Sequence, residues 1–310
     1  MPVRVSARSF VITGRTHVYG VLGDPVSHSL SPVFWNAALR AVGLDAVYVP
    51  FPVPAGRLST ALAGLQASGV RGVNVTLPHK EAAAAACTAL EAPADQIGAV
   101  NTVRFAADGT MHGYNTDALG MIDLLATFDR PPDKVVLLGA GGAAKAVLWS
   151  LFQAGATVVY WSNRTGSRLV SPWGSDRTRV QPVPWASESL KDAMVDSTLI
   201  INATSLGWRA EDRLPWLGQT LSPRSTYLDL NYHPSSRLLL DARANGARVI
   251  DGLALLVRQG AAAFTLLTGM PAPLSVMRRA LRRHLGVQAT DSEASPRSQG
   301  ASAPSPRRRQ

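Results

Sequence analysis

The sequence of 310 residues is almost free of cysteine, since Cys87 is its only one. A lone cysteine cannot form a disulfide within the chain, which excludes a disulfide-stapled scaffold and indicates a reducing compartment. Long apolar runs are also missing, and the apolar part of the N-terminus, residues 10–12, is too short for a signal-peptide core. We therefore expect a cytoplasmic protein with no membrane partner.

Acidic residues are scarce, with 21 Asp and Glu against 31 Lys and Arg and a formal net charge of +10. The basic residues are scattered and are not interleaved with aromatic residues, so the sequence does not predict a nucleic-acid partner. His, Cys and carboxylate residues lack the spacing of metal ligands, so we expect no metal. Residues 286–310 contain no aromatic residue and are rich in Ser, Pro, Ala and Arg, which predicts a disordered tail.

Residues 1–16 are interpreted as an N-terminal extension, and the chain then alternates apolar strands with helices. This order predicts an α/β fold with two domains, the first over residues 17–117 with a mostly parallel sheet. Its strands are predicted at 18–22, 46–51, 72–77, 99–105 and 110–114, the last two joined at Asp108-Gly109. Its helices are predicted at 32–42, 58–68 and 78–90.

A second βαβ series over residues 118–251 predicts a Rossmann-like domain. Its strands are predicted at 135–138, 156–161, 196–202, 226–231 and 248–250. Its helices are predicted at 118–128, 142–154, 187–194 and 235–245. Two more helices follow at 252–268 and 274–285 and could complete either domain.

Strand 135–138 leads directly into a glycine turn and a helix, which is the pattern of a dinucleotide site. Gly139 permits the tight turn and Gly141 lets the backbone approach a pyrophosphate. Backbone N–H groups at the helix start would then face the phosphates. The cofactor-binding residues predicted here are Gly139, Ala140, Gly141, Gly142 and Ala143.

The loop after the next strand predicts NADP rather than NAD. A dinucleotide fold uses an acid there to bind the ribose 2′-hydroxyl, or basic residues to accept a 2′-phosphate. This loop has no acid and contains Asn163, Arg164, Thr165 and Arg168, which offer planar cations and hydroxyl or amide groups. The alternative reading is a solvated basic loop.

Polar residues gather at the predicted strand ends of the first domain, and most have a structural explanation. Ser31 could cap a helix that starts at Pro32, and Asp117 could cap helix 118–128. Lys80 is harder to explain, because the first turn of a helix disfavours a cation. Gln259 interrupts an apolar helical stripe and needs a polar partner, for which a substrate hydroxyl is one candidate.

Eight motifs, in order, resemble those of the shikimate dehydrogenase family: GDPVSHSLSP, GVNVTLPHKE, GAVNT, GYNTD, GAGGAAKA, NRT, NATSLG and IDGLALLVRQ. The match spans about residues 17–285. The resemblance implies NADP-dependent, reversible reduction of 3-dehydroshikimate to shikimate, in the pathway to chorismate and the aromatic amino acids. It also implies that helices within 252–285 return to the first domain to complete a substrate-binding domain.

By the same resemblance, Lys80 and Asp117 would be the catalytic acid–base pair. The implied substrate-binding residues are Ser29, Ser31, Asn74, Thr76, Asn101, Tyr232 and Gln259. Asn163, Arg164, Thr165 and Arg168 would face the 2′-phosphate, and Thr204 and Gly252 would also contact the cofactor.

Three residues depart from the family pattern and leave the substrate open. Trp35 stands in place of the usual His, Trp208 in place of Met, and Ala254 in place of Gly. The alternatives are a quinate/shikimate dehydrogenase, a paralogue acting on a related hydroxy-cyclohexene carboxylate, or a non-catalytic dinucleotide-binding regulator. The expected partner is a small-molecule substrate, and the protein is expected to be a monomer or homodimer.

Overall fold

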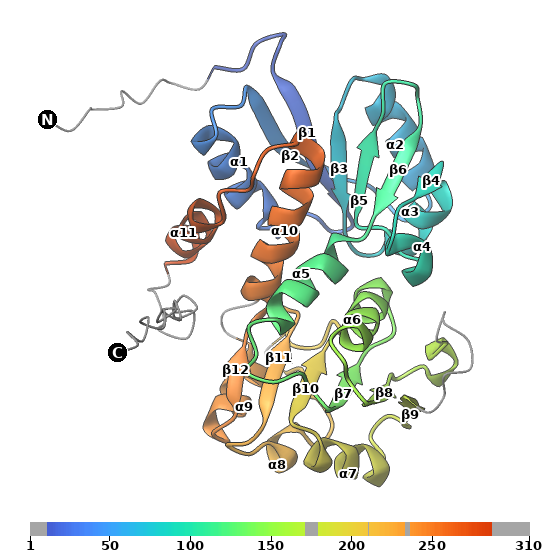
Figure 1. Ribbon diagram of the computed structural model, residues 1–310, viewed down its shortest axis with the longest axis vertical. Coiled ribbons are helices and arrows are strands. Elements are labelled where there is room, and N and C mark those ends of the chain that lie inside the picture. The colour runs from blue at the N-terminus through green and yellow to red at the C-terminus, as the bar shows by residue number, and fades with distance from the viewer. Residues whose placement is uncertain (1–10, 171–178, 210, 233–235, 287–310) are drawn as a thin grey trace, which may run out of the picture.

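The computed structural model describes residues 11–170, 179–209, 211–232 and 236–286. The predicted tail from 287 onward and the first ten residues of the N-terminal extension lie outside this part. The described chain forms two β-sheets, one above the other in the view of Figure 1, with the helices α5 (Thr116–Leu125) and α10 (Gly252–Thr268) running between them. The predicted α/β class with two domains is confirmed.

The upper sheet has the strand order β2-β1-β3-β5-β6-β4 in the described residues. Its strands are β1 (His17–Gly23), β2 (Ala46–Pro52), β3 (Gly72–Val75), β4 (Ala89–Leu90), β5 (Thr102–Phe105) and β6 (Met111–Tyr114). Strands β2, β1 and β3 are parallel to one another, whereas β5 pairs antiparallel with β3 and with β6. The β5–β6 pair is the hairpin predicted at Asp108-Gly109, and Gly109 has the positive φ of 86° that such a turn favours.

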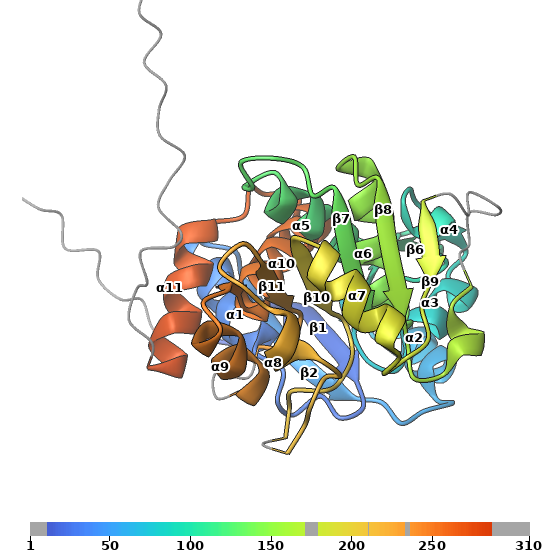
Figure 2. The ribbon, with the colours of Figure 1, turned by 90° about the horizontal axis from the view of Figure 1, so that it is seen from below.

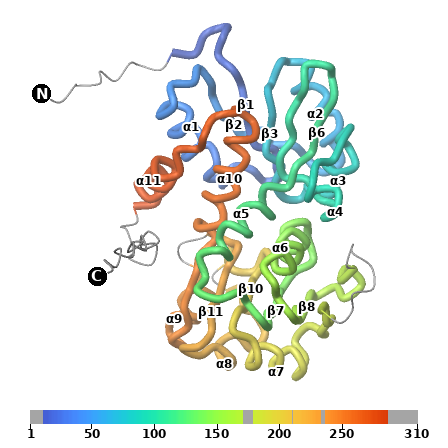
Figure 3. The backbone as a smooth tube through the Cα atoms, viewed as in Figure 1, coloured from blue at the N-terminus to red at the C-terminus, as the bar shows by residue number. Residues whose placement is uncertain are grey.

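Helices cover both faces of this sheet. On one face lie α1 (Ser31–Ala41), α10 and α11 (Leu274–Leu285), whose apolar side chains share a buried cluster with β1 and β2. On the other face, α2 (Leu58–Ala67) and α3 (Lys80–Ala86) bury their apolar sides against β1, β3 and β5, near the short helix α4 (Ala94–Ile97). The C-terminal helices therefore return to the first sheet, as Figure 3 shows by the orange and red trace beside the blue one.

The lower sheet is parallel throughout, with the order β12-β11-β10-β7-β8-β9 in the described residues. Its strands are β7 (Lys134–Leu138), β8 (Val158–Ser162), β9 (Val180–Pro182), β10 (Leu199–Asn202), β11 (Thr226–Asp229) and β12 (Arg248–Ile250). This is the doubly wound Rossmann order, in which β7 and β10 flank the point where the strand order reverses. Ligands bind such sheets beyond the carboxyl ends of these two strands.

Two apolar layers enclose the lower sheet. Helices α5, α10 and α6 (Gly142–Gln153) pack on one face. The other face is covered by α7 (Glu188–Asp196), α8 (Leu217–Thr220) and α9 (Arg237–Ala244), which lie in the foreground of Figure 2. The strands read as continuous apolar runs because both of their faces are buried.

Several predicted bounds were wrong for identifiable reasons. The helix predicted at 78–90 ends at Ala86, because residues 89–90 pair with β6 and tertiary pairing outweighs the helix propensity of the alanine run. The strand predicted from residue 196 begins at Leu199, because α7 continues to Asp196. The short elements β4, α4, β9, α8 and the 3-10 turn Gly166–Arg168 were not predicted, since each has too few residues to show a period.

Candidate active site

A pocket of about 160 Å³ opens between the carboxyl ends of the two sheets. The upper sheet and its helices contribute Val21, Ser29, Ser31, Asn74, Val75, Thr76, Lys80, Asn101 and Asp117. The remaining wall consists of Ala143, Val147, Leu230, Tyr232, Gly252, Leu255, Leu256 and Gln259. The fold thus brings into one cavity every predicted catalytic and substrate-binding residue.

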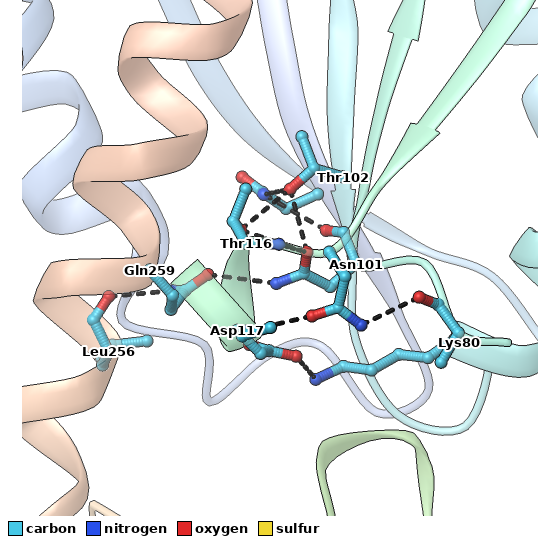
Figure 4. Close-up of polar contacts among 11 residues, drawn as sticks. Lys80, Asn101, Thr102, Thr116, Asp117, Leu256 and Gln259 are labelled. Carbon is cyan, nitrogen blue, oxygen red and sulfur yellow. Dashed lines mark hydrogen bonds and ion pairs between the residues drawn. The ribbon is translucent and has the colours of Figure 1, made fainter. Parts of the chain in front are cut away.

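Lys80 and Asp117 form the charged centre of this pocket. Lys80 is the first residue of α3, and Asp117 lies in the first turn of α5. Lys80 Nζ donates to Asp117 Oδ2 at 2.6 Å, and the two side chains are only 18% and 13% exposed. The amino end of α5 favours the carboxylate, which in turn holds the ammonium group. Figure 4 shows Lys80 extending to Asp117, while Gln259 extends from α10 to Asn101.

Asn101 connects the start of α5, at Thr116, with Gln259 on α10 (Figure 4). Its Oδ1 accepts bonds from Thr116 N at 2.7 Å and from Thr116 Oγ1 at 3.1 Å. Its Nδ2 donates to Gln259 Oε1 at 3.4 Å, and Gln259 Nε2 donates to Leu256 O at 2.8 Å. Buried amides need such partners, and these bonds fix the orientation of both side chains before any ligand enters.

Asn74 is oriented by a residue that the sequence analysis did not single out, Tyr48 on β2. The Tyr48 hydroxyl donates to Asn74 Oδ1 at 2.7 Å and also hydrogen bonds Ser31. Burial raises the pKa of Tyr48 well above its usual range, so the hydroxyl keeps its proton. Trp35 stacks on the Tyr48 ring with centroids 4.5 Å apart. Tyr48 occupies an alternating position of a strand, which on sequence alone reads as ordinary core.

The predicted structural explanations for two site residues were wrong. Helix α1 begins at Ser31 rather than after it, with Leu30 at the N-cap and no side-chain cap, which leaves the Ser31 hydroxyl to bond Tyr48. Helix α5 begins at Thr116 and is capped by Asn115, whose Oδ1 accepts from Ala118 N at 3.0 Å. Asp117 is therefore not needed as a cap.

Tyr232 and Trp208 follow strands of the lower sheet and contact the segment 28–30, next to Ser29 and Ser31. Tyr232 hydrogen bonds the backbone of Leu30, and burial raises the pKa of its hydroxyl. The Trp208 ring lies edge-on to Tyr232 at 5.3 Å and to His28 at 5.1 Å. The departure at Trp208 thus adds an aromatic contact between the two halves beside Ser29.

The glycine turn lies next to Lys80, across the gap between the sheets. Gly139 has a φ of 114°, and a Cβ there would lie 2.6 Å from Ala203 O, so only glycine fits without strain. A Cβ on Gly142 would lie 3.1 Å from Lys80 Cβ. Gly141, the N-cap of α6, has open space where its Cβ would point. Buried Ala140 and the pocket residue Ala143 complete the turn.

Of the other predicted cofactor residues, Gly252 begins α10 and lines the pocket, and the rest follow β8 and β10. Asn163 Nδ2 donates to Thr165 O at 2.9 Å, and the side chains of Arg164 and Arg168 are exposed on the same short loop. Thr204 Oγ1 donates to Asn202 Oδ1 at 2.6 Å in the loop after β10. These loops follow neighbouring strands on either side of β7, as a bound dinucleotide requires. Figure 4 does not extend to them, but their strands are labelled in Figure 1.

None of the described helices is long and apolar enough to cross a membrane. In the same described residues, no group of three His, Cys, Asp or Glu side chains could hold a metal ion.

Comparison with known proteins agrees with the motifs. The family model for the shikimate dehydrogenase substrate binding domain matches residues 21–103, and that for the shikimate 5′-dehydrogenase C-terminal domain matches residues 252–282. The chain is 42% identical to shikimate dehydrogenase (NADP(+)) of Moorella thermoacetica, over 89% of this chain and 96% of that protein.

Solved structures are similar over the same extent. The shikimate dehydrogenase of Aquifex aeolicus has a TM-score of 0.80 and 37% identity, covering 88% of this chain and 100% of that one. The Thermus thermophilus shikimate 5-dehydrogenase in complex with NADP(H) and shikimate has a TM-score of 0.76 and 36% identity, covering 86% and 99%.

Proposed function

We propose, since this chain belongs to the shikimate dehydrogenase family, that it catalyses the NADP-dependent, reversible reduction of 3-dehydroshikimate to shikimate. The observation that carries the proposal is the Lys80–Asp117 pair, 2.6 Å apart in a pocket that the glycine turn borders. The substrate-binding domain would comprise residues 17–117 with 252–285, and the NADP-binding domain residues 118–251.

The residues present fit NADP. The open space at Gly141 lets a pyrophosphate approach the N–H groups at the start of α6. Arg164 and Arg168 would bind the 2′-phosphate, with Asn163 and Thr165 beside them, and the turn from Gly139 to Ala143 would hold the pyrophosphate. Thr204 and Gly252 would border the nicotinamide side. When bound, the reduced cofactor supplies the hydride that reduces the ring carbonyl.

The polar residues of the pocket fit a small hydroxylated carboxylate. Hydroxyl groups of Ser29, Ser31 and Tyr232 would bind the carboxylate, since all three line the pocket and Tyr232 hydrogen bonds the backbone of Leu30, which lies between the two serines. Asn74, Thr76, Asn101 and Gln259 would hold the ring hydroxyls, because amides both donate and accept. The Tyr48 hydroxyl fixes Asn74 and Ser31 from behind.

Lys80 has two roles in the proposed reaction. Its ammonium group stabilises the negative charge that develops on the carbonyl oxygen, and it then donates the proton that completes the alcohol. Asp117 orients the ammonium group through the 2.6 Å bond and accepts a hydrogen bond from a substrate hydroxyl. In the reverse direction the Lys80–Asp117 pair removes the hydroxyl proton.

The absorbance of the reduced nicotinamide tests this function directly. Purified protein is supplied with shikimate or quinate, each with NADP or with NAD. We expect shikimate with NADP to give the highest kcat/KM of the four combinations. Absence of turnover with shikimate and NADP would contradict the proposal, and a preference for quinate would assign the chain to the alternative substrate.

A further inference from the structure

Asp229, the last residue of β11, is fully buried and has no role in the proposed chemistry. Three N–H donors converge on its Oδ1: Asn202 Nδ2 at 3.0 Å, Asn231 N at 2.9 Å and Asn231 Nδ2 at 3.0 Å. The Tyr227 hydroxyl donates to its Oδ2 at 2.9 Å. A single carboxylate thus gathers donors from two adjacent strands and the segment after them.

The partners of Asp229 shape the loops that border the cofactor side of the pocket. Asn202 Oδ1 accepts from Thr204 N at 3.0 Å and from Thr204 Oγ1 at 2.6 Å, and Asn202 Nδ2 also donates to Leu206 O. Asn231 Nδ2 donates to Thr204 O at 3.1 Å and to Leu206 O at 2.7 Å, and Asn231 O accepts from Gly252 N. The Asp229 carboxylate is therefore the common anchor of the loop after β10 and of the turn into α10.

The carboxylate is held at a desolvated position. Burial raises the pKa of Asp229 from an ordinary 3.8 to about 6, against the opposing effect of bonds from Asn231, Tyr227 and Asn202. The titratable neighbour on its own strand is Tyr227, and burial raises the pKa of that hydroxyl too, so it stays protonated. Asp251 follows the neighbouring strand β12 and accepts from Leu253 N. Bonds to an ionised acceptor are about twice as strong as bonds to a neutral one.

We propose that Asp229 is a positioning residue, whose ionised carboxylate holds the loop at 202–206 and the Asn231–Tyr232 segment in the shape that receives the dinucleotide. The inference rests on the proposed function, because it assigns these loops to the cofactor. It extends that function by naming a residue that acts through Asn202 and Asn231 without touching a ligand.

The role of the Asp229 charge is tested by NADP binding. Dissociation constants are measured by protein fluorescence for the wild type and for Asp229→Asn. The amide keeps the shape and the Oδ1 acceptor, so we expect binding about fivefold weaker at about pH 8. Because the pKa of Asp229 is about 6, the wild type is mostly protonated at about pH 5, and the ratio of the two constants should move toward one. Taking the ratio cancels the titration of the cofactor's own phosphate. A ratio that is equal at both pH values would overturn the inference.

Hydrogen exchange of the backbone amides, measured without any ligand, tests the same role independently of binding. Asp229→Ala should speed exchange at Thr204, Leu206 and Asn231 by about tenfold or more, because their partners lose the common anchor. Asp241→Asn, a change on α9, is the matched control and should leave these amides unchanged. Unchanged exchange in a folded Asp229→Ala protein would also overturn the inference.

If Asp229→Ala does not fold, exchange is measured on Asp229→Asn instead. Above about pH 6 we expect a smaller increase in the exchange rate at the same amides. No change there would count against the inference. If the wild type binds no NADP, the proposed function fails, and the exchange measurement still decides whether Asp229 anchors these loops.

Discussion

Lys80 and Asp117 are 37 residues apart in the chain and 2.6 Å apart in the fold. Each group occupies a helix start, where the backbone N–H groups stabilise an anion and destabilise a cation. The helix start therefore stabilises the carboxylate, whereas the ammonium group depends on the carboxylate and, in the proposed reaction, on the negative charge that develops on the substrate. Because the helix start does not stabilise it, the Lys80 ammonium group is free to stabilise negative charge on an oxygen atom in the pocket.

Arg164 tests the cofactor assignment at the scale of one side chain. Arg164→Ala should reduce the ratio of kcat/KM for NADP to that for NAD by about tenfold, because a charge-assisted bond to the 2′-phosphate is lost. Arg57→Ala removes an exposed arginine from the upper half and serves as the control, with no change in the ratio. An unaltered ratio in Arg164→Ala would refute the phosphate role. Steady-state kinetics with both cofactors gives the answer.

Asp229 predicts a specific dependence of stability on pH. Its pKa rises from 3.8 in the unfolded chain to about 6 in the fold, so the folded state takes up its proton more readily. The resulting destabilisation is fully present above about pH 6 and disappears as the pH falls below about 4. The free energy of unfolding of the wild type relative to Asp229→Asn should thus fall by up to about 3 kcal/mol from pH near 4 to pH near 8, because the cost of burying the charge outweighs the stronger bonds that the ionised carboxylate makes to Asn202 and Asn231. Urea unfolding at both pH values measures this, and a relative free energy that rises with pH would contradict it.

At the scale of elements, the crossing of α5 and α10 sets the distance between Asp117 and Gln259. Gly120 allows the close approach, since a Cβ there would lie 2.6 Å from the backbone N of Gln259. The two helices pack in the same apolar cluster as the lower sheet, and α10 also packs on the upper one. Their crossing therefore determines the width of the pocket and how the upper and lower sheets are placed relative to each other.

Gly120→Ala should force these helices apart. We expect a loss of about 1–3 kcal/mol in the free energy of unfolding, as for other overpacked positions, and a kcat/KM for shikimate lower by about tenfold or more. Gly64→Ala in α2 is the matched control, because its Cβ would meet open space and should stabilise the helix by about 0.5–1 kcal/mol. Equal stability and activity for the two variants would count against the proposed role of this crossing.

The sequence predicted the long elements well and the short ones poorly, for physical reasons. Helices α10 and α11 have the predicted bounds because their apolar periodicity extends over several turns. Lys80 stood out because a cation at a helix start is unfavourable. Tyr48 and Asp229 did not stand out, because their roles depend on neighbours that only the packed sheets bring together. The pairing of residues 89–90 with β6 is likewise a long-range effect.

At the scale of the whole molecule, the two halves also meet through α6, on the side away from α10. Buried Ala146 packs with Ile97, Ala99 and Ala118, and Trp149 Nε1 donates to Gln96 Oε1 at 2.8 Å. Because α6 starts at the glycine turn, this contact sets how close the glycine turn lies to Lys80. Small side chains at the interface keep the two sheets near each other.

Ala146→Leu should widen this interface. The larger side chain would shift α6 and its glycine turn away from Lys80, and we expect kcat/KM to fall by about tenfold or more, since small misplacements reduce catalysis strongly. Ala193→Leu overpacks the opposite face of the lower sheet and should destabilise the fold without that loss of activity. The comparison requires kinetics and thermal unfolding of both variants. Similar activities at similar stabilities would refute the importance of this interface.

The most direct test of the account is the turnover of Lys80→Ala beside its affinity for shikimate, measured by calorimetry. We predict that kcat falls by about 10²–10⁴-fold while the dissociation constant for shikimate changes little. Lys134→Ala breaks an exposed lysine–aspartate pair of similar length, 2.7 Å, and should keep wild-type turnover. Unchanged turnover in Lys80→Ala would contradict the account.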